Sequence, residues 1–204
     1  TWEEDRVEDV FSELAGKLGM KIFVWTNNAG LVQYPSAPSA EDTGTKTPLA
    51  ALNQIMTHKS PALYILKDYH HFMKDADVQR KLRDEVNNFR KADKILAVTA
   101  PVVDFPIELE KLITVIDFGL PDKNDLKELV EKMKNNKNRK TPMVVDMTEV
   151  DYEKLLYSVL GLTISEAENV FNKTLIVNGK LDVNAIPIVL KEKQQLIRKS
   201  GMLE

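Results

Sequence analysis

The sequence predicts an α/β domain built on a parallel sheet, followed by a smaller helical domain. Short apolar runs alternate with helical patterns along the first 120 residues. These runs are too hydrophobic on both faces for half-exposed strands, and strands that alternate with helices form a parallel sheet covered on both faces. Beyond Pro121 only helical patterns follow. We therefore expect an α/β domain over residues 1–120, and a helical, lid-like domain with its linker over residues 121–204.

The elements of the first domain follow from hydrophobic spacing and turn residues. Apolar residues at steps of three and four predict a helix over residues 5–18, which Gly19 ends. Prolines interspersed with Ser, Ala and Gly over residues 27–46 predict one long, mobile loop. Periodicity and residue type predict the remaining elements, which are helices over residues 48–57 and 78–90 and strands over residues 21–26, 62–66, 95–99 and 113–118.

The second domain is marked by helix caps and breakers. Asp122 or Asn124 can cap a helix that runs to about residue 134, and the Lys- and Asn-rich residues 134–140 predict a solvated loop. Residues 163–166 (Thr-Ile-Ser-Glu) form a capping-box pattern that opens a second helix. A last helix is predicted over residues 182–198, broken or entered late because of Pro187.

Composition excludes several classes of function. A net charge of −3 and a pI of about 5.7 leave no basic excess for a surface committed to nucleic acid or anionic lipid. The absence of cysteine excludes disulfides, thiolate catalysis and Cys-ligated metals. No apolar run approaches the length of a membrane span, so we expect a soluble protein of the bacterial cytoplasm or the plastid stroma, with no membrane partner. Because the sequence begins at Thr1, we also expect it to be a piece of a longer protein.

A parallel sheet followed by a small helical bundle is the plan of AAA-type modules, which share the fold of P-loop NTPases, so nucleotide motifs are the first test. The phosphate-binding loop G-x-x-x-x-G-K-[ST] has no match; residues 44–47 (Gly-Thr-Lys-Thr) are nearest but have the wrong spacing. A Walker B strand ends in Asp-Glu, which support magnesium and polarise the attacking water. Here Lys67 stands at the magnesium position and Asp68 at that of the catalytic Glu, a degenerate Walker B.

The polar cluster that follows this strand suggests a metal site as one hypothesis. Asp68, His70 and His71 are residue types that ligate metals. Adjacent histidines are expected to point in different directions, and only one further histidine occurs in the chain, so we predict no metal site and no catalytic residue. A metal-dependent hydrolase with a site at Asp68, His70 and Asp104 stays as the enzyme alternative.

Basic residues on and after the helix predicted over residues 78–90 suggest a nucleic-acid-binding surface as another hypothesis. Acidic residues dilute its basic ones, so we expect a solvated face and no nucleic-acid partner. A nucleic-acid or clamp-associated binding module stays as a further alternative. The basic residues in question are Arg80, Lys81, Arg83, Arg90, Lys91 and Lys94.

Six segments resemble a known family, the AAA ATPases of plastids, cyanobacteria and other bacteria called hypothetical chloroplast reading frame forty-six. The resemblance covers the N-terminal region of that family and nearly the whole of this chain. The segments are WEEDRV (2–7), PLAAL (48–52), PALYILKDYH (61–70), ELEKLITVIDF (108–118), LGLTISEAEN (160–169) and KQQLIRKSG (193–201).

The resemblance implies a degenerate module beside a competent one. It implies a β-strand just before Trp2, and a second module with intact nucleotide motifs, which would use ATP and magnesium, after this region. Compared with active modules, acidic residues 3–5 stand at the phosphate loop, Lys111 is the sole candidate for the arginine finger, and Ala167 and Glu168 lie near the place of the nucleotide-sensing arginine. We expect no cofactor for this chain.

The same resemblance suggests a role. A degenerate module beside a competent ATPase would serve oligomer assembly, regulation or partner binding rather than catalysis. Its expected partner is the C-terminal AAA module of the same polypeptide, with a homo-oligomer as a further arrangement to test.

Overall fold

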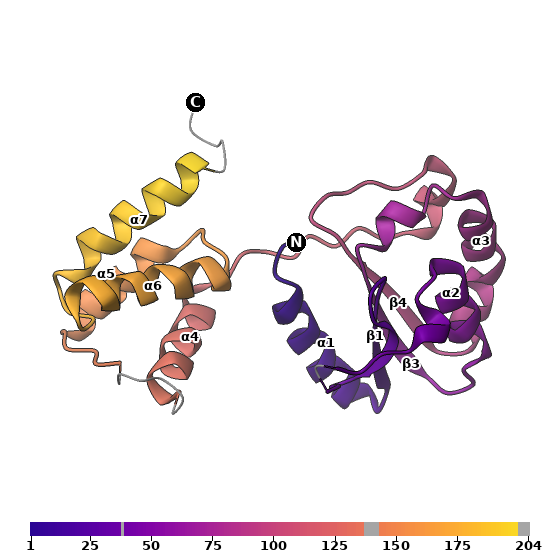
Figure 1. Ribbon diagram of the computed structural model, residues 1–204, viewed down its shortest axis with the longest axis horizontal. Helices are drawn as coiled ribbons and strands as arrows, with labels where there is room; N and C mark the ends of the chain where they lie inside the picture. The colour runs from indigo at the N-terminus through magenta and orange to yellow at the C-terminus, as the bar shows by residue number, and fades with distance from the viewer. Residues whose placement is uncertain (38, 137–142, 200–204) are drawn as a thin grey trace. The chain divides into compact units, whose positions relative to one another are not determined.

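The computed structural model describes residues 1–37, 39–136 and 143–199. The chain divides into two compact units, Thr1–Phe118 and Gly119–Glu204 (Figure 1). Within the described ranges no helix is long and apolar enough to cross a membrane. Residues 137–140 of the loop predicted at 134–140 lie outside the described residues.

The first unit is built on a four-stranded sheet in the order β2-β1-β3-β4. Strands β1 (Lys21–Thr26), β3 (Ala62–Lys67) and β4 (Lys94–Thr99) are parallel, with Val24 opposite Ile65 and Ile65 opposite Ala97. These three strands and the helices between them are those predicted, so the predicted α/β class is confirmed. The sheet is mostly parallel, because β2 is its one antiparallel strand among the described residues.

Helices cover both faces of this sheet. Helix α1 (Glu4–Leu18) lies on one face, and α2 (Pro48–Thr57) and α3 (Ala76–Lys91) lie on the other (Figure 1). Alternate residues of β3 serve the two layers: Leu63 and Ile65 pack in the core cluster of α1, and Tyr64 and Leu66 pack in the cluster of α2 and α3. This double burial explains why β3 is apolar without alternation.

The predicted mobile loop at residues 27–46 is wrong, because it contains a strand and an anchored turn. Strand β2 (Gly30–Tyr34) pairs antiparallel with β1, and the 3-10 turn η1 (Thr43–Thr45) follows. The Trp25 indole N–H donates to the Thr45 carbonyl at 2.7 Å, and the Leu31 amide donates to the Thr45 hydroxyl at the same distance. Gly30, at φ 77°, lets the backbone turn tightly against Asp42.

The strand predicted at residues 113–118 is also wrong. This segment follows the 3-10 turn η3 (Ile107–Leu112) and forms no ladder with any described strand, although its residues are β-branched and apolar. A strand needs a neighbour to accept its backbone hydrogen bonds. The strand that the family resemblance implies just before Trp2 would lie ahead of this sequence, so it is no partner here. Val115 and Ile116 are left exposed.

The second unit is helical, as predicted, with helices α4 (Lys123–Asn135), α5 (Glu149–Val159), α6 (Ile164–Asn178) and α7 (Ala185–Lys199). Asp122 caps α4 and Thr163 caps α6, each in a capping box. Pro187 is the third residue of α7, where the helix needs no backbone donor, so it enters the helix without breaking it. Helix α5, capped by Thr148, was not predicted.

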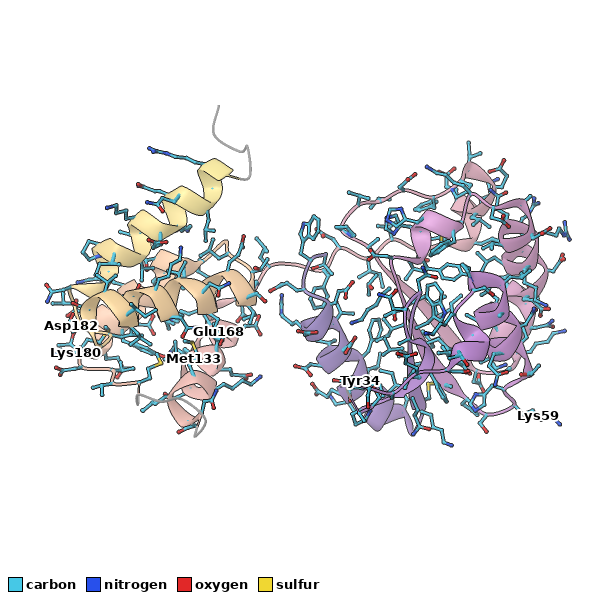
Figure 2. The ribbon with its side chains drawn as sticks, viewed as in Figure 1. Tyr34, Lys59, Met133, Glu168, Lys180 and Asp182 are labelled. Carbon is cyan, nitrogen blue, oxygen red and sulfur yellow. The ribbon has the colours of Figure 1, made fainter. Side chains whose placement is uncertain are left out.

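Both units have dense apolar cores. Figure 2 shows their side chains as sticks, with Met133 among those of the helical unit. That core joins all four helices around fully buried residues, among them Leu126, Leu156, Phe171 and Val189.

Two glycines of the first unit give a matched test of the anchored turn. A Cβ on Gly30 would lie 2.0 Å from the Asp42 carbonyl oxygen, whereas one on Gly19, also at positive φ, would meet no atom within 4 Å. Gly19→Ala should lower the free energy of unfolding by about 1–2 kcal/mol, the cost of a left-handed alanine. Gly30→Ala should lower it by about 1–3 kcal/mol more, because the backbone must shift.

Denaturant unfolding followed by tryptophan fluorescence measures both variants, because Trp2 and Trp25, the only tryptophans, belong to this unit. Equal losses would contradict the packing of Gly30 against Asp42.

Candidate functional site

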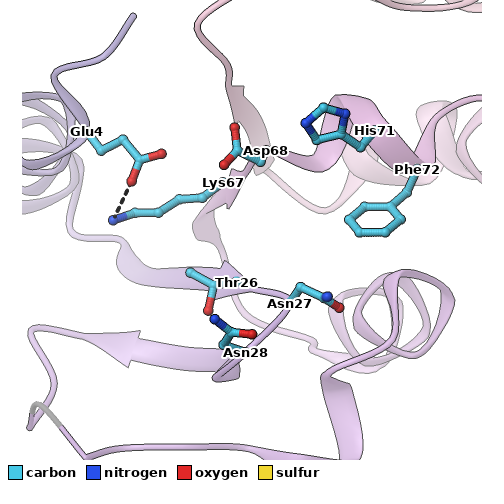
Figure 3. Close-up of a pocket in the computed structure, with 8 residues that line it drawn as sticks. All are labelled: Glu4, Thr26, Asn27, Asn28, Lys67, Asp68, His71 and Phe72. Carbon is cyan, nitrogen blue, oxygen red and sulfur yellow. Dashed lines mark ion pairs between the residues drawn. The ribbon is translucent and has the colours of Figure 1, made fainter.

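A polar cavity of about 380 Å³ opens at the carboxyl ends of β1 and β3 (Figure 3). Ligands of open α/β sheets bind at this edge. The cavity belongs entirely to the first unit. It is lined by Glu4, Thr26, Asn27, Asn28, Lys67, Asp68, His71 and Phe72.

Lys67 forms an internal ion-pair cluster at the end of β3. Its ammonium group lies 3.2 Å from a carboxylate oxygen of Glu4 (Figure 3). It lies closer still to the carboxylate of Glu8, one turn further along α1. Burial alone lowers the pKa of Lys67, but the hydrogen bonds and charges of Glu8 and Glu4 outweigh it and raise the pKa above its ordinary value. The ammonium therefore stays charged, and two carboxylates neutralise it.

Sequence reasoning placed Lys67 at the degenerate metal position and acidic residues at the loop position, but it missed Glu8. A signal was present, because Glu4 and Glu8 are four residues apart on a helix and so share one face. The side chain of Glu8 is only 12% exposed, as expected for a carboxylate with a fixed partner.

Asp68 stands at the junction of β3 with the 3-10 turn η2 (Tyr69–Phe72). Its backbone is left-handed, with φ 54°, and its amide donates to the Thr99 carbonyl at 2.9 Å. This bond ties the ends of β3 and β4 together. A left-handed conformation is uncommon for a residue other than glycine, and here it turns the chain sharply into η2.

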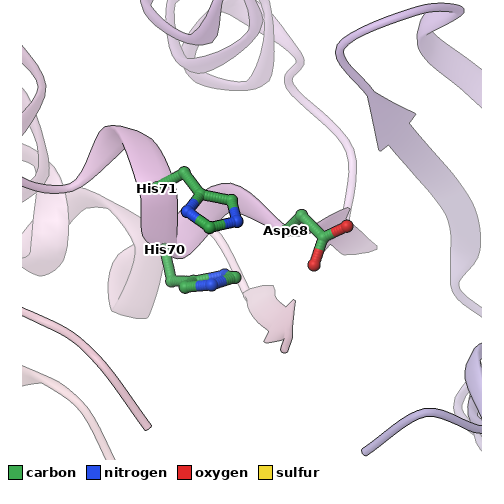
Figure 4. Close-up of side chains that lie close together, drawn as sticks. All are labelled: Asp68, His70 and His71. Atoms are coloured by element: carbon green, nitrogen blue, oxygen red, sulfur yellow. The ribbon is translucent and has the colours of Figure 1, made fainter. Parts of the chain in front are cut away.

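The expectation that the adjacent histidines point apart is wrong. In the tight turn η2, the rings of His70 and His71 lie side by side, with centroids 3.9 Å apart and planes inclined by 37° (Figure 4). His70 is buried, and its Nδ1 has no hydrogen-bond partner within the described part of the chain. Burial and the neighbouring His71 lower the pKa of His70, so its imidazole is neutral near pH 7.

Asp104 of the alternative hydrolase site is engaged elsewhere. Its carboxylate accepts a hydrogen bond from Lys74 at 2.9 Å. This bond, more than the charges of the two histidines, lowers the pKa of Asp104. The structure thus brings Asp68 and His70 together, while the Asp104 carboxylate forms an ion pair with Lys74.

The basic helix α3 neutralises much of its charge internally. Arg80 pairs with Asp84, and Lys81 pairs with Glu85 at 3.3 Å. Lys94, at the start of β4, donates to the carbonyls of Ile55 and Met56. These side chains are committed to local partners, which weakens the case for a nucleic-acid surface.

Of the remaining positions singled out by sequence, Lys111 belongs to the first unit but does not line the cavity, and Ala167 and Glu168 belong to the helical unit. Lys111 is exposed in η3, and Ala167 is fully buried in the core of the helical unit. Glu168 is exposed on α6 (Figure 2).

Comparison with known proteins identifies both units. Residues 1–118 match the SpoVK-like AAA ATPase, N-terminal domain, and residues 124–200 match the SpoVK-like AAA ATPase, second domain. Several relatives carry the name uncharacterized AAA domain-containing protein ycf46. Those of Trieres chinensis and Guillardia theta are 30% and 29% identical to this chain over its full length. The match covers 40% and 39% of the length of these two relatives, respectively. That of Pyropia yezoensis is 27% identical, over 100% of this chain and 40% of its own length. The chain thus spans about two fifths of these relatives.

Removing the Lys67 ammonium should destabilise the first unit. Lys67→Met leaves two partly buried carboxylates without their counter-ion, which should lower the free energy of unfolding by about 1–3 kcal/mol. The matched control is Lys17→Met, which breaks the exposed pair of α1 with Glu13 and should leave the free energy of unfolding nearly unchanged.

Denaturant titration followed by tryptophan fluorescence compares the two variants. Adding Glu8→Gln to Lys67→Met should recover part of the loss, because one unpaired carboxylate is then neutral. Similar losses for Lys67→Met and Lys17→Met would contradict the cluster.

Proposed function

The chain belongs to the SpoVK-like AAA ATPase family, and we propose that it is the non-catalytic N-terminal region of a larger ATPase, serving assembly, regulation or partner binding. The observation that carries this proposal is the cluster of Lys67 with Glu4 and Glu8 at the carboxyl edge of the sheet. It supports a module whose nucleotide site has become an internal structural contact.

The cluster opposes each part of a magnesium–nucleotide complex. Magnesium in such sites is held by carboxylates and phosphates, whereas the Walker B position here carries an ammonium already bonded to two carboxylates. Glu4 and Glu8 lie on the first turns of α1, where an active module uses the helix start to bind phosphate. Their negative charges would repel a phosphate chain at short range.

The proposed partner is a C-terminal AAA module of the same polypeptide. The relatives are named AAA domain-containing proteins, and this chain covers only about two fifths of their length. ATP and magnesium would belong to that module. Exposed apolar side chains gather in the segment that ends the first unit and could contact it: Val102, Val103, Ile107, Val115 and Ile116.

Titration with a fluorescent ATP analogue and magnesium tests whether this chain binds nucleotide, which a catalytic module must do. The isolated chain should give no saturable signal up to millimolar analogue, while the full-length polypeptide should bind. Micromolar binding by the chain that Asp68→Ala abolishes would contradict the proposal and favour the hydrolase alternative.

Mixing the chain with the remainder of its polypeptide, expressed separately, tests the partner. We expect a complex in sedimentation velocity, weakened by Ile116→Asp, because a charge would be buried at the contact. Val150→Asp, at an exposed β-branched residue of α5, is the matched control and should leave the complex intact. No complex, or equal effects of both variants, would contradict this assignment of the surface.

A further inference from the structure

We propose that Asp68, His70 and His71 form a binding site for a divalent transition-metal ion of the Zn²⁺ type (Figure 4). Each residue offers one ligand atom, and these atoms all lie within 4.8 Å of one another. All three belong to one short turn after β3, so the site needs no contribution from a distant segment.

The donor set indicates which ion fits. Two imidazole nitrogens and one carboxylate oxygen suit Zn²⁺, Co²⁺ or Ni²⁺, whereas Mg²⁺ and Ca²⁺ prefer oxygen alone. Zinc bonds of about 2.0–2.2 Å place tetrahedral ligand atoms about 3.4 Å apart. The present spacing of up to 4.8 Å therefore asks the side chains to close by about 1.4 Å, which rotation about their own bonds can supply.

Two side chains of the cluster have unused ligand capacity. His70 is only 4% exposed, yet its Nδ1 has no hydrogen-bond partner among the residues the structure describes. Nor does any described residue hold the Asp68 carboxylate by a hydrogen bond or ion pair. A buried polar atom normally has a partner, and a metal ion would supply one to the His70 ring. The Asp68 carboxylate is exposed, so it is accessible to the same ion.

The backbone of the turn holds the three residues in place. The Asp68 amide donates to Thr99, the His71 amide donates to the Asp68 carbonyl at 3.2 Å, and the Met73 amide donates to the His70 carbonyl at 3.3 Å. The left-handed Asp68 starts this turn, so its unusual conformation serves to bring its side chain near the two rings.

The surrounding charges leave room for a cation. The nearby Lys74 is paired with Asp104. The ammonium of Lys67 is held by Glu8 and by Glu4, the second of which Figure 3 shows. Asp68 and His71 also line the cavity, which gives an ion a path from solvent and leaves a coordination position open to water. The site is thus next to the Lys67 cluster but independent of it.

Titration of the full chain, without a histidine tag, by Zn²⁺ and by Co²⁺ tests the site. We expect one equivalent of Zn²⁺ to bind with micromolar or tighter affinity in calorimetry, and Co²⁺ to give the visible absorption of a low-coordinate site. Mg²⁺ should not compete. His71→Ala should weaken Zn²⁺ binding about 100-fold or more, since loss of a supporting outer-shell group alone costs about 10- to 100-fold.

His71 is exposed, so this variant should keep its fold, which circular dichroism verifies. Asp68→Asn should also weaken binding. The matched control His58→Gln removes the third histidine, which lies before β3 and bonds Tyr64, and should leave affinity unchanged. Absence of Zn²⁺ binding at micromolar affinity, or equal affinity in the native chain and His71→Ala, would overturn the proposal.

Discussion

The contact of Lys67 with Glu4 and Glu8 is the constraint on which the carboxyl edge of the sheet depends. It joins the last residue of β3 to the first two turns of α1, and so fixes the helix over the strand ends. A partly buried cation with two carboxylate partners is stable as a set but costly to break, because each remaining charge would lack its counter-ion. At the edge where active modules hold a metal and phosphates, this chain has an ion-pair cluster of its own side chains.

The same edge keeps a second set of groups unengaged. The αL backbone of Asp68 separates Lys67, which turns toward α1, from the histidines of η2, whose rings lie side by side. The charged side chains of one half of the edge are therefore paired with one another, while the other half has a buried ring nitrogen and a carboxylate with no described partner. The proposed loss of a nucleotide site and the proposed metal site are compatible, because they use different side chains at one strand end.

Much of the fold could be predicted because local signals and burial agree. Strand β3 is apolar on both faces. The side chains of Asp122 and Thr163 each accept a hydrogen bond from a backbone amide of the helix that they cap, so these helix starts can be recognised locally. Strand β2 was missed because Pro and Gly dominate its surroundings, and only the tertiary contacts of Thr45 show that the region is anchored. The segment at 113–118 has strand chemistry but no neighbouring strand, a condition that no local pattern reports. At the site, the sequence placed Lys67 and Asp68, but not Glu8 or the close approach of the His70 and His71 rings. The first depends on how α1 packs against the end of β3, and the second on how the chain turns after it.

We propose that the ion pairs of Lys67 with Glu4 and Glu8 occupy the place where active modules bind magnesium together with the nucleotide. A crystal structure of the chain grown with excess magnesium and a non-hydrolysable ATP analogue tests it most directly. We expect Lys67 within ion-pair distance of both Glu4 and Glu8, and no nucleotide density at the carboxyl ends of β1 and β3. Phosphates bound in that cavity, with Lys67 turned away from the two carboxylates, would contradict it.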